Sequence, residues 1–139
     1  MNILFYGFRH GHILSCYREA KNNPNYTIVG ALEENVQARK DAEQALGIQL
    51  DEGSYQQWLS KAEVEVVAIG GAYGDRGAAI IQALQHGKHV ISDKPLCTDP
   101  AQLEQIRTLD KRRLREHMGH LGEQQMAMVD DAIAVSFGL

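Results

Sequence analysis

Short apolar runs alternate along the chain with longer stretches in which apolar residues recur every three or four positions. Runs of this length that are rich in β-branched residues and bounded by turn-forming residues predict β-strands. Four such runs cover residues 3–6, 26–32, 64–69 and 89–91. The run at 64–69 is almost wholly apolar, which predicts a strand buried on both faces of a parallel sheet.

The intervening stretches predict helices. Helical spacing of apolar residues covers residues 13–20, 36–46, 55–59 and 76–86. Gly47 and Gly87 stand just past two of these helices, where glycine often ends a helix. Asp99 can cap a further helix, with Pro100 in its first turn and Gln102 at the capping-box position. Strands that alternate with such helices pair in parallel through right-handed crossovers, so we predict an α/β fold, a doubly wound parallel sheet, over residues 1–109.

Residues 110–139 form an atypical tail. The segment 107–120 is strongly charged and contains the basic run 111–115, but five basic and five acidic residues occur from Arg107 onward. A solvated helix face explains this segment better than a nucleic-acid patch. Residues 132–137 are apolar and can form one last strand.

Bulk composition agrees with a single soluble domain. The chain has 139 residues, of which 44% are hydrophobic and 23% charged, and its net charge of −4 favours neither nucleic acid nor an anionic membrane as partner. Cys16 and Cys97 lack metal-ligand or redox-pair spacing, which indicates a reducing compartment. The first residues lack the basic head of a signal peptide, and no stretch has the length of a membrane span. We therefore expect a cytoplasmic protein.

The order of elements at the start of the chain is typical of dinucleotide binding. A strand, a glycine turn and a helix are followed by an acid at the end of the second strand, which can hold the adenosine ribose. Glu33 lies twenty-one residues after His12, close to the spacing of about 20 that this arrangement has. Glu34 adds a second carboxylate that would repel a ribose 2′-phosphate. The pair favours NAD over NADP.

The glycine pattern of the turn departs from G-x-G-x-x-G. Reading from Gly7 places Arg9 and His12 where the second and third glycines stand, with Gly11 one place early. We expect Arg9 to keep the backbone farther from the pyrophosphate while its guanidinium pairs with phosphate. We expect His12 to crowd the helix against the strand. The helix N-terminus favours negative charge, so the predicted pyrophosphate-binding residues are Gly7, Arg9, His10, Gly11 and His12.

A metal site offers another interpretation of this turn. His10 and His12 could act with His86 or His89, but no acid or cysteine completes a ligand set. A polar turn at a helix start is the simpler account, and we predict no metal.

Residues 87–96, Gly-Lys-His-Val-Ile-Ser-Asp-Lys-Pro-Leu, resemble the G-K-H-V-x-x-E-K-P-L segment of the Gfo/Idh/MocA oxidoreductases, named for glucose-fructose oxidoreductase and inositol dehydrogenase. The resemblance includes the preceding helix and strand and spans about residues 1–109. It implies an NAD(P)-dependent oxidoreductase that moves hydride between nicotinamide and a hydroxyl-bearing carbon of a sugar or cyclic polyol. A small-molecule substrate is then the expected partner.

The resemblance also assigns roles to residues. The family lysine sits beside nicotinamide and hydrogen-bonds the reacting oxygen, a role that passes to Lys94, where a cation stabilises alkoxide character. Pro95 would aim that lysine, and Asp93 replaces the usual glutamate. The family's T-P-N-x-x-H after the preceding strand is replaced at 71–76, with Arg76 in place of histidine. The further cofactor-binding residues implied are Gly71, Tyr73, Arg76, Asp93 and Pro95.

Family enzymes continue into a second domain that carries the substrate pocket and an Asp/His pair, and residues 110–139 do not resemble that continuation. The histidines and aspartates of the tail are therefore not that pair. The alternative hypothesis is a truncated or non-catalytic module that binds dinucleotide or acts through association. Apolar sheet surface left without a second domain favours a homodimer or homo-oligomer. The Lys94-Pro95 segment argues against another Rossmann class, such as a methyltransferase.

Overall fold

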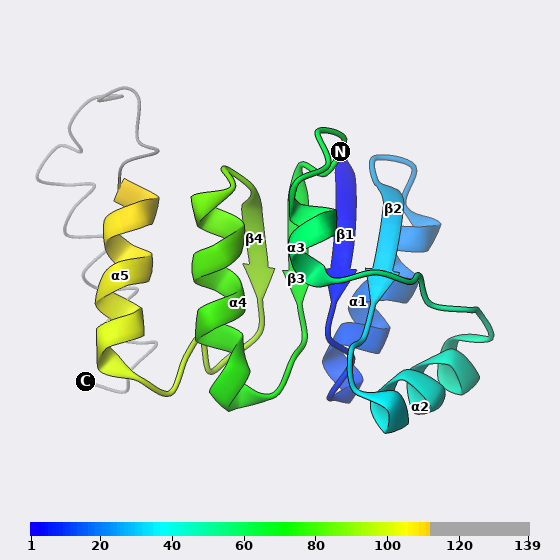
Figure 1. The fold of residues 1–139 in the computed structure, drawn as a ribbon. Helices are drawn as coiled ribbons and strands as arrows, with labels where there is room; N and C mark the ends of the chain where they lie inside the picture. The colour runs from blue at the N-terminus through cyan, green and yellow to red at the C-terminus, as the bar shows by residue number, and fades with distance from the viewer. Residues whose placement is uncertain (112–139) are drawn as a thin grey trace, which may run out of the picture.

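The computed structural model describes residues 1–111 and shows helices alternating with strands (Figure 1). The strands are β1 (Asn2–Tyr6), β2 (Thr27–Leu32), β3 (Val66–Ile69) and β4 (His89–Ser92). The helices are α1 (Gly11–Asn22), α2 (Val36–Leu46), α3 (Tyr55–Leu59), α4 (Tyr73–Gln85) and α5 (Pro100–Lys111). Each predicted strand and helix up to α5 is present; α2 and α3 have the predicted bounds, and the other elements before α5 begin or end one to three residues away from theirs.

The strands form one sheet in the order β2-β1-β3-β4, and every neighbouring pair is parallel. The predicted doubly wound α/β fold is confirmed. From β1 the chain crosses to β2 on one side and later to β3 on the other, so the strand order reverses at β1. Ligands of such sheets bind at the carboxyl ends of the strands beside this reversal. These ends point downward in Figure 1.

The sheet separates two hydrophobic cores because side chains alternate between its faces. One core lies between the sheet and the helices α1 and α2; it includes Phe5, Ile13, Tyr17 and Ala68. The other lies under α3, α4 and α5; it includes Leu4, Trp58, Val67, Ile80 and Ile106. Helices on both faces explain why the β3 run is apolar throughout: every residue of β3 is buried.

The two faces differ at β4. The register pairs Ala68 with Ile91, so Ile91 lies on the face that carries α1. Its side chain is nevertheless 44% exposed. Val90 points to the opposite face and packs against the core under α4. Among the described residues, the α1 layer therefore stops short of β4.

Trp58 closes the core beside β2. Its ring lies where a side chain on Gly30 would stand, since a Cβ there would come within 2.5 Å of the ring. The Lys61 ammonium sits over the same ring, 3.0 Å from its centroid, in a cation–π contact. Glycine in β2 is thus required by the close approach of α3.

Two local predictions are corrected. Helix α4 begins at Tyr73, three residues before the predicted start at Arg76, because the Ala72 carbonyl already accepts from the amides of Asp75 and Arg76. The Asp99 side chain does accept a bond from an amide of the first turn of α5, that of Ala101. The capping box with Gln102 is absent, since the Oε1 of Gln102 is buried without a hydrogen-bond partner in the described chain.

Helix α5 is described to Lys111. The charged helix predicted to continue to residue 120 and the last strand predicted at 132–137 lie outside the described residues. Within residues 1–111, no helix combines the length and the apolar character needed to cross a membrane.

Candidate functional site at the carboxyl edge of the sheet

The β1–α1 turn presses against the loop that follows β3. Gly7 has a φ of +79°, and a Cβ at this position would come within 2.5 Å of the Gly71 amide nitrogen. Gly70 in turn has Ile13 against it, where a Cβ would lie 2.5 Å from the Ile13 Cβ. The small residue that allows helix and sheet to approach is therefore Gly70 in the β3–α4 loop. His12 is exposed, so the expectation that it crowds the helix against the strand is wrong.

The backbone donors of the turn are bound within the protein. The amide of Gly7 donates to the Leu32 carbonyl at 2.8 Å, that of Phe8 to Glu33 Oε2 at 2.7 Å, and that of Arg9 to the Gly70 carbonyl at 3.0 Å. The next amides open helix α1, where the first turn has no acceptor four residues earlier. A Cβ on Gly11 would meet nothing within 4 Å. The open anion-binding position is therefore the first turn of α1.

Glu33 organises this turn while keeping acceptor capacity. Its side chain is buried, with Oε2 accepting from the Phe8 amide at 2.7 Å and Oε1 from the Asn35 amide at 2.8 Å. The Nε of Arg9 lies 4.0 Å from Oε2. Each carboxylate oxygen can accept a second bond, so the two ribose hydroxyls remain possible partners.

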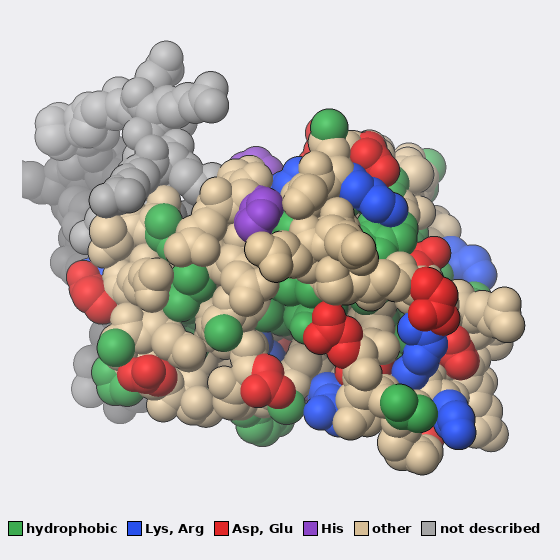
Figure 2. Space-filling model, in the orientation of Figure 1, with side chains coloured by type: hydrophobic (Ala, Val, Ile, Leu, Met, Phe, Trp, Pro, Cys, Tyr) green, Lys and Arg blue, Asp and Glu red, His purple; other side chains and the backbone are tan. Residues whose placement is uncertain are grey.

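A cavity of about 280 Å³ opens beside Glu33. Charged side chains of both signs and apolar surface line it together; the lining residues are Tyr6, Gly7, Arg9, Glu33, Glu34, Asn35, Gly71, Asp75, Arg76 and Ala79. A second hollow of about 410 Å³ shares Tyr6, Glu34, Asp75 and Ala79 with it and extends along α3 and α4. Figure 2 shows acidic side chains along the lower half of the molecule and also at its upper right, with basic side chains beside several of them. The two hollows adjoin along these shared residues, and we call them together the adenosine groove, after the half of the dinucleotide that we propose for it below.

Two tyrosines form one wall of the adenosine groove. The rings of Tyr6 and Tyr55 stack with centroids 3.8 Å apart and an interplanar angle of 8°. The Tyr6 hydroxyl donates to Glu34 Oε2 at 3.1 Å, and the Tyr55 amide donates to Oε1 at 3.2 Å. Burial, with the nearby Glu34 charge, raises the pKa of Tyr6 far above its ordinary value. The hydroxyl therefore stays protonated and holds Glu34 at the mouth of the groove.

Lys94 lies in the loop after β4, at the same edge of the sheet. The Lys94–Pro95 peptide bond is cis, and the Lys94 side chain is exposed. The Lys94 amide donates to Asp93 Oδ1 at 2.8 Å, and this bond lowers the pKa of Asp93 below its ordinary value. Asp93 stays ionised beside Lys94 at neutral pH.

Arg76 is completely buried beneath this loop. Its Nη1 donates to the carbonyls of Asp93 and Pro95, both at 2.9 Å. Its Nη2 donates to the Gly71 carbonyl at 3.1 Å and lies 2.7 Å from His10 Nε2. A guanidinium only donates, so His10 Nε2 must accept and the ring is neutral with its proton on Nδ1. Burial, reinforced by the Arg76 charge, lowers the pKa of His10.

A third cavity, of about 250 Å³, lies between α1 and β4. It is lined by His10, His12, Ile13, Cys16, Ile69, Ile91, Ser92 and Asp93. It opens on the face where the α1 layer stops short of β4, next to the Lys94 loop. The carboxyl edge thus carries the adenosine groove on the β2 side of the turn and this cavity on the β4 side.

The structure brings most of the predicted site residues together. The β1–α1 turn, Glu33, Gly71, Arg76 and the 93–95 loop meet at this edge, while Tyr73 is 54% exposed with its ring 5.0 Å from the Arg76 guanidinium carbon. Sequence reasoning missed Tyr6, Tyr55 and Asp75. Tyr6 was signalled only by its place as the last residue of a strand before the glycine turn. Within residues 1–111, no group of three or more His, Cys, Asp or Glu is placed to hold a metal ion.

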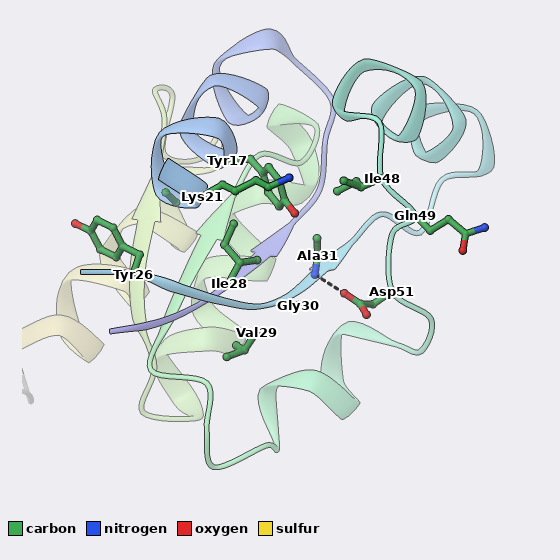
Figure 3. A pocket seen from close by; sticks show the side chains of 11 residues that line it. Tyr17, Lys21, Tyr26, Ile28, Val29, Gly30, Ala31, Ile48, Gln49 and Asp51 are labelled. Carbon is green, nitrogen blue, oxygen red and sulfur yellow. Dashed lines mark hydrogen bonds between the residues drawn. The ribbon is translucent and has the colours of Figure 1, made fainter. Parts of the chain in front are cut away.

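A larger hollow of about 460 Å³ follows the outer edge of β2 (Figure 3). Asp51 closes one end of it by accepting from the Ala31 amide at 2.8 Å. Tyr17, Lys21 and Tyr26 also line it, but none of the predicted site residues does. The candidate site therefore lies at the carboxyl edge and not in this groove.

Solved structures with the same fold come from several bacteria. A putative oxidoreductase from Erwinia carotovora atroseptica has a TM-score of 0.74 at 19% identity, covering 84% of this chain and 35% of that one. An NAD-binding protein from Listeria innocua has a TM-score of 0.66 at 26% identity, covering 80% and 32%. A 3-ketoreductase from Actinomadura kijaniata, in complex with TDP-benzene and NADP, has a TM-score of 0.62 at 23% identity, covering 81% and 35%. The chain spans about a third of the length of these relatives.

The sequence also matches the model of a protein family. The model for the oxidoreductase family with an NAD-binding Rossmann fold matches residues 2–120. This range contains the turn at Gly7, the acid at Glu33 and the Lys94–Pro95 segment. The chain therefore belongs to the Gfo/Idh/MocA family of oxidoreductases and carries its NAD-binding Rossmann domain.

Proposed function

We propose that this chain is the cofactor-binding part of an NAD-dependent oxidoreductase that transfers hydride between nicotinamide and a hydroxyl-bearing carbon of a sugar or cyclic polyol. The observation that carries the proposal is that the turn at Gly7, the carboxylate of Glu33 and the Lys94 loop converge on one edge of the sheet, where strand order reverses. The substrate class rests on the family resemblance. The Actinomadura relative is a 3-ketoreductase, and a ketone is the oxidised form of a hydroxyl-bearing carbon, which supports the reaction type.

The residues at this edge fit a dinucleotide. The open first turn of α1, with Gly11 and His12 exposed, suits the pyrophosphate, and Arg9 can pair with its charge. The free lone pairs of Glu33 suit the ribose hydroxyls. The adenosine groove beside the Tyr6–Tyr55 stack suits the adenine. The β4-side cavity and Lys94 then face the nicotinamide half.

NAD is favoured over NADP by the charge of the adenosine groove. Glu33, Glu34 and Asp75 line it, against Arg9 and the buried Arg76. A ribose 2′-phosphate beside Glu33 would bring about two further negative charges toward these carboxylates. The Actinomadura relative is in complex with NADP, so the proposed preference for NAD does not come from that relative. It rests on the acidic residues of this chain.

In the proposed mechanism Lys94 acts on the substrate oxygen. The dinucleotide accepts or donates the hydride when bound. The Lys94 ammonium hydrogen-bonds the reacting oxygen and stabilises the negative charge that develops there as hydride leaves the carbon. Asp93 keeps a compensating charge beside the lysine. The hydroxyl proton must pass to a base, which we propose comes, with the substrate pocket, from a second domain or a partner subunit.

A non-catalytic dinucleotide-binding or association module is the second candidate. The observation that favours it is that the amides of Gly7, Phe8 and Arg9 are all bound within the protein, which leaves only the α1 turn for phosphate. The exposed Ile91 face offers a surface for homo-oligomerisation. This candidate predicts a folded chain that binds dinucleotide weakly or not at all.

Calorimetric titration with NADH and NADPH tests the proposal. We expect NADH to bind roughly tenfold more tightly, a difference of about 1.4 kcal/mol. Glu34→Gln should narrow that ratio, because it removes a charge at the groove. Glu104→Gln is the matched control, since this exposed acid pairs only with Arg107 on α5 in the described chain. A folded chain that binds neither dinucleotide would overturn the proposal, and tighter binding of NADPH would overturn the choice of NAD.

A further inference from the structure

Arg76 joins three loops at the carboxyl edge. Its four contacts reach His10 in the β1–α1 turn, Gly71 in the β3–α4 loop, and the carbonyls of Asp93 and Pro95 in the loop after β4. The two carbonyls on Nη1 belong to the residues on either side of Lys94. One guanidinium therefore holds the lysine's own backbone from both sides.

The loop after β4 makes few hydrogen bonds to other elements, although Cys97 packs against the core under α4. Its other hydrogen bonds are local: the Lys94 amide to Asp93, the Ser92 hydroxyl to the Asp93 carbonyl, and the Cys97 thiol to the Asp99 carbonyl. Within residues 1–111, only Arg76 donates hydrogen bonds that tie residues 93–98 to another element. The planar fork allows Nη1 and Nη2 to address different loops at once, which a lysine ammonium on a flexible stem does not reproduce.

The burial of Arg76 is costly for stability alone. Its side chain has no exposed surface, and no carboxylate of the described chain lies within ion-pair distance of it. Its Nε is also buried without a partner in residues 1–111. Carbonyl dipoles and a neutral histidine compensate a buried charge only in part. An apolar residue would fill this place at lower cost, which points to a role in arranging the edge of the sheet.

We propose that Arg76 is a positioning residue: its guanidinium fixes the Asp93–Pro95 segment against the β1–α1 turn and so sets the place of Lys94 relative to the nicotinamide. The inference rests on the function proposed above and adds a determinant that acts through Lys94. Arg76 also lines the adenosine groove, so direct contact with the pyrophosphate is the competing role. The two roles differ in which half of the dinucleotide they affect.

The test uses Arg76→Lys and Arg76→Met in the purified chain, with Arg39→Lys as the matched control. Arg39 also donates to backbone carbonyls, those of Leu50 and Asp51, but away from the site. Amide hydrogen exchange reports local order, and calorimetry compares NADH with ADP-ribose, which lacks the nicotinamide. For Arg76→Lys we expect roughly tenfold faster exchange in residues 92–98, with β1 and β3 unchanged, and roughly tenfold weaker NADH binding. ADP-ribose binding should stay the same, and Arg39→Lys should change neither property in the site.

Three results would overturn the inference. Equal weakening of NADH and ADP-ribose would make Arg76 a direct pyrophosphate ligand. A uniform rise in exchange across the sheet would make it a purely structural residue. Unchanged exchange in residues 92–98 would show that the loop does not depend on it. If the wild-type chain binds neither ligand, the proposed function fails, and the exchange measurement alone still decides whether Arg76 holds the loop.

Should both Arg76 variants fail to fold, the wild-type protein labelled with ¹⁵N-arginine decides the question. The side-chain NH signals of Arg76 should shift on addition of NADH and stay in place on addition of ADP-ribose. Equal shifts with both ligands would overturn the inference.

Discussion

The β1–α1 turn and the loop after β4 lie at the same edge of the sheet but are held in different ways. Three successive backbone amides, those of Gly7, Phe8 and Arg9, tie the turn to three different partners. The loop after β4 is hydrogen-bonded to other elements, within residues 1–111, through the one side chain of Arg76, and it also packs Cys97 against the core beside α4. The turn is thus held through its own backbone amides, one of which is bound by the Glu33 carboxylate, whereas the hydrogen bonds that hold the loop come from a single side chain.

This difference explains how the turn tolerates an unusual sequence. The side chains of Arg9 and His12 are exposed, and the fold of the turn uses backbone atoms. The positions that cannot accept a side chain are Gly7 and Gly70, where the backbone of another element is in contact. The glycines around this turn therefore divide into Gly7 and Gly70, which the fold requires, and Gly11, where it leaves room for a side chain.

Substitution of Gly7 should produce the largest effect. Gly7→Ala places a Cβ against the Gly71 backbone and forces a non-glycine residue to a φ of +79°. We expect the free energy of unfolding to fall by about 3 kcal/mol, measured by chemical denaturation. Gly11→Ala is the control, because a Cβ there meets nothing within 4 Å, and it should change stability by less than about 1 kcal/mol. Similar losses in both variants would show that the turn is not fixed by backbone contact.

Substitution of Glu33 should have a smaller effect. Glu33→Gln leaves one oxygen to accept from a backbone amide and turns an amide donor toward the other, so one of the bonds to Phe8 and Asn35 is lost. We expect a loss of about 1–3 kcal/mol in the free energy of unfolding. Glu104→Gln on the exposed face of α5 serves again as control. An unchanged denaturation midpoint for Glu33→Gln would contradict the role of this carboxylate in holding the turn.

The smallest effect should be a pH dependence carried by His10, where turn and loop meet. Its folded-state pKa is lowered by burial, so in mildly acidic solution the unfolded chain binds more protons than the folded one. The stability contributed by neutral His10 is present above its ordinary pKa of about 6.5 and is lost as the pH falls below that value. His10→Gln should therefore flatten the dependence of the thermal-unfolding midpoint on pH in this range. Identical slopes in the wild-type protein and in His10→Gln would contradict the neutral His10–Arg76 contact.

The sheet and its topology could be predicted from the sequence because they depend on local patterns. Apolar runs give the strands, glycines mark the helix ends, and the resemblance locates Lys94. The hydrogen-bond partners of Arg76 could not be predicted, because they come from three loops that meet only once the strands have paired in their register. The sequence also did not reveal that Gly70, and not the residue at position 12, is the small residue that lets helix α1 approach the sheet. The contact between Gly70 and Ile13 joins segments far apart in the chain.

Trp58, packed on Gly30, is the one tryptophan of the chain. Its helix, α3, also contributes Tyr55 to the wall of the adenosine groove. Tryptophan emission overlaps the absorption band of reduced nicotinamide, so light absorbed by this residue can be passed to a bound NADH as resonance energy. Because the chain has one tryptophan, Trp58 beside β2 is the only tryptophan donor of this energy. The efficiency of energy transfer from Trp58 to bound NADH would therefore report the distance between this residue and the nicotinamide, without an added label.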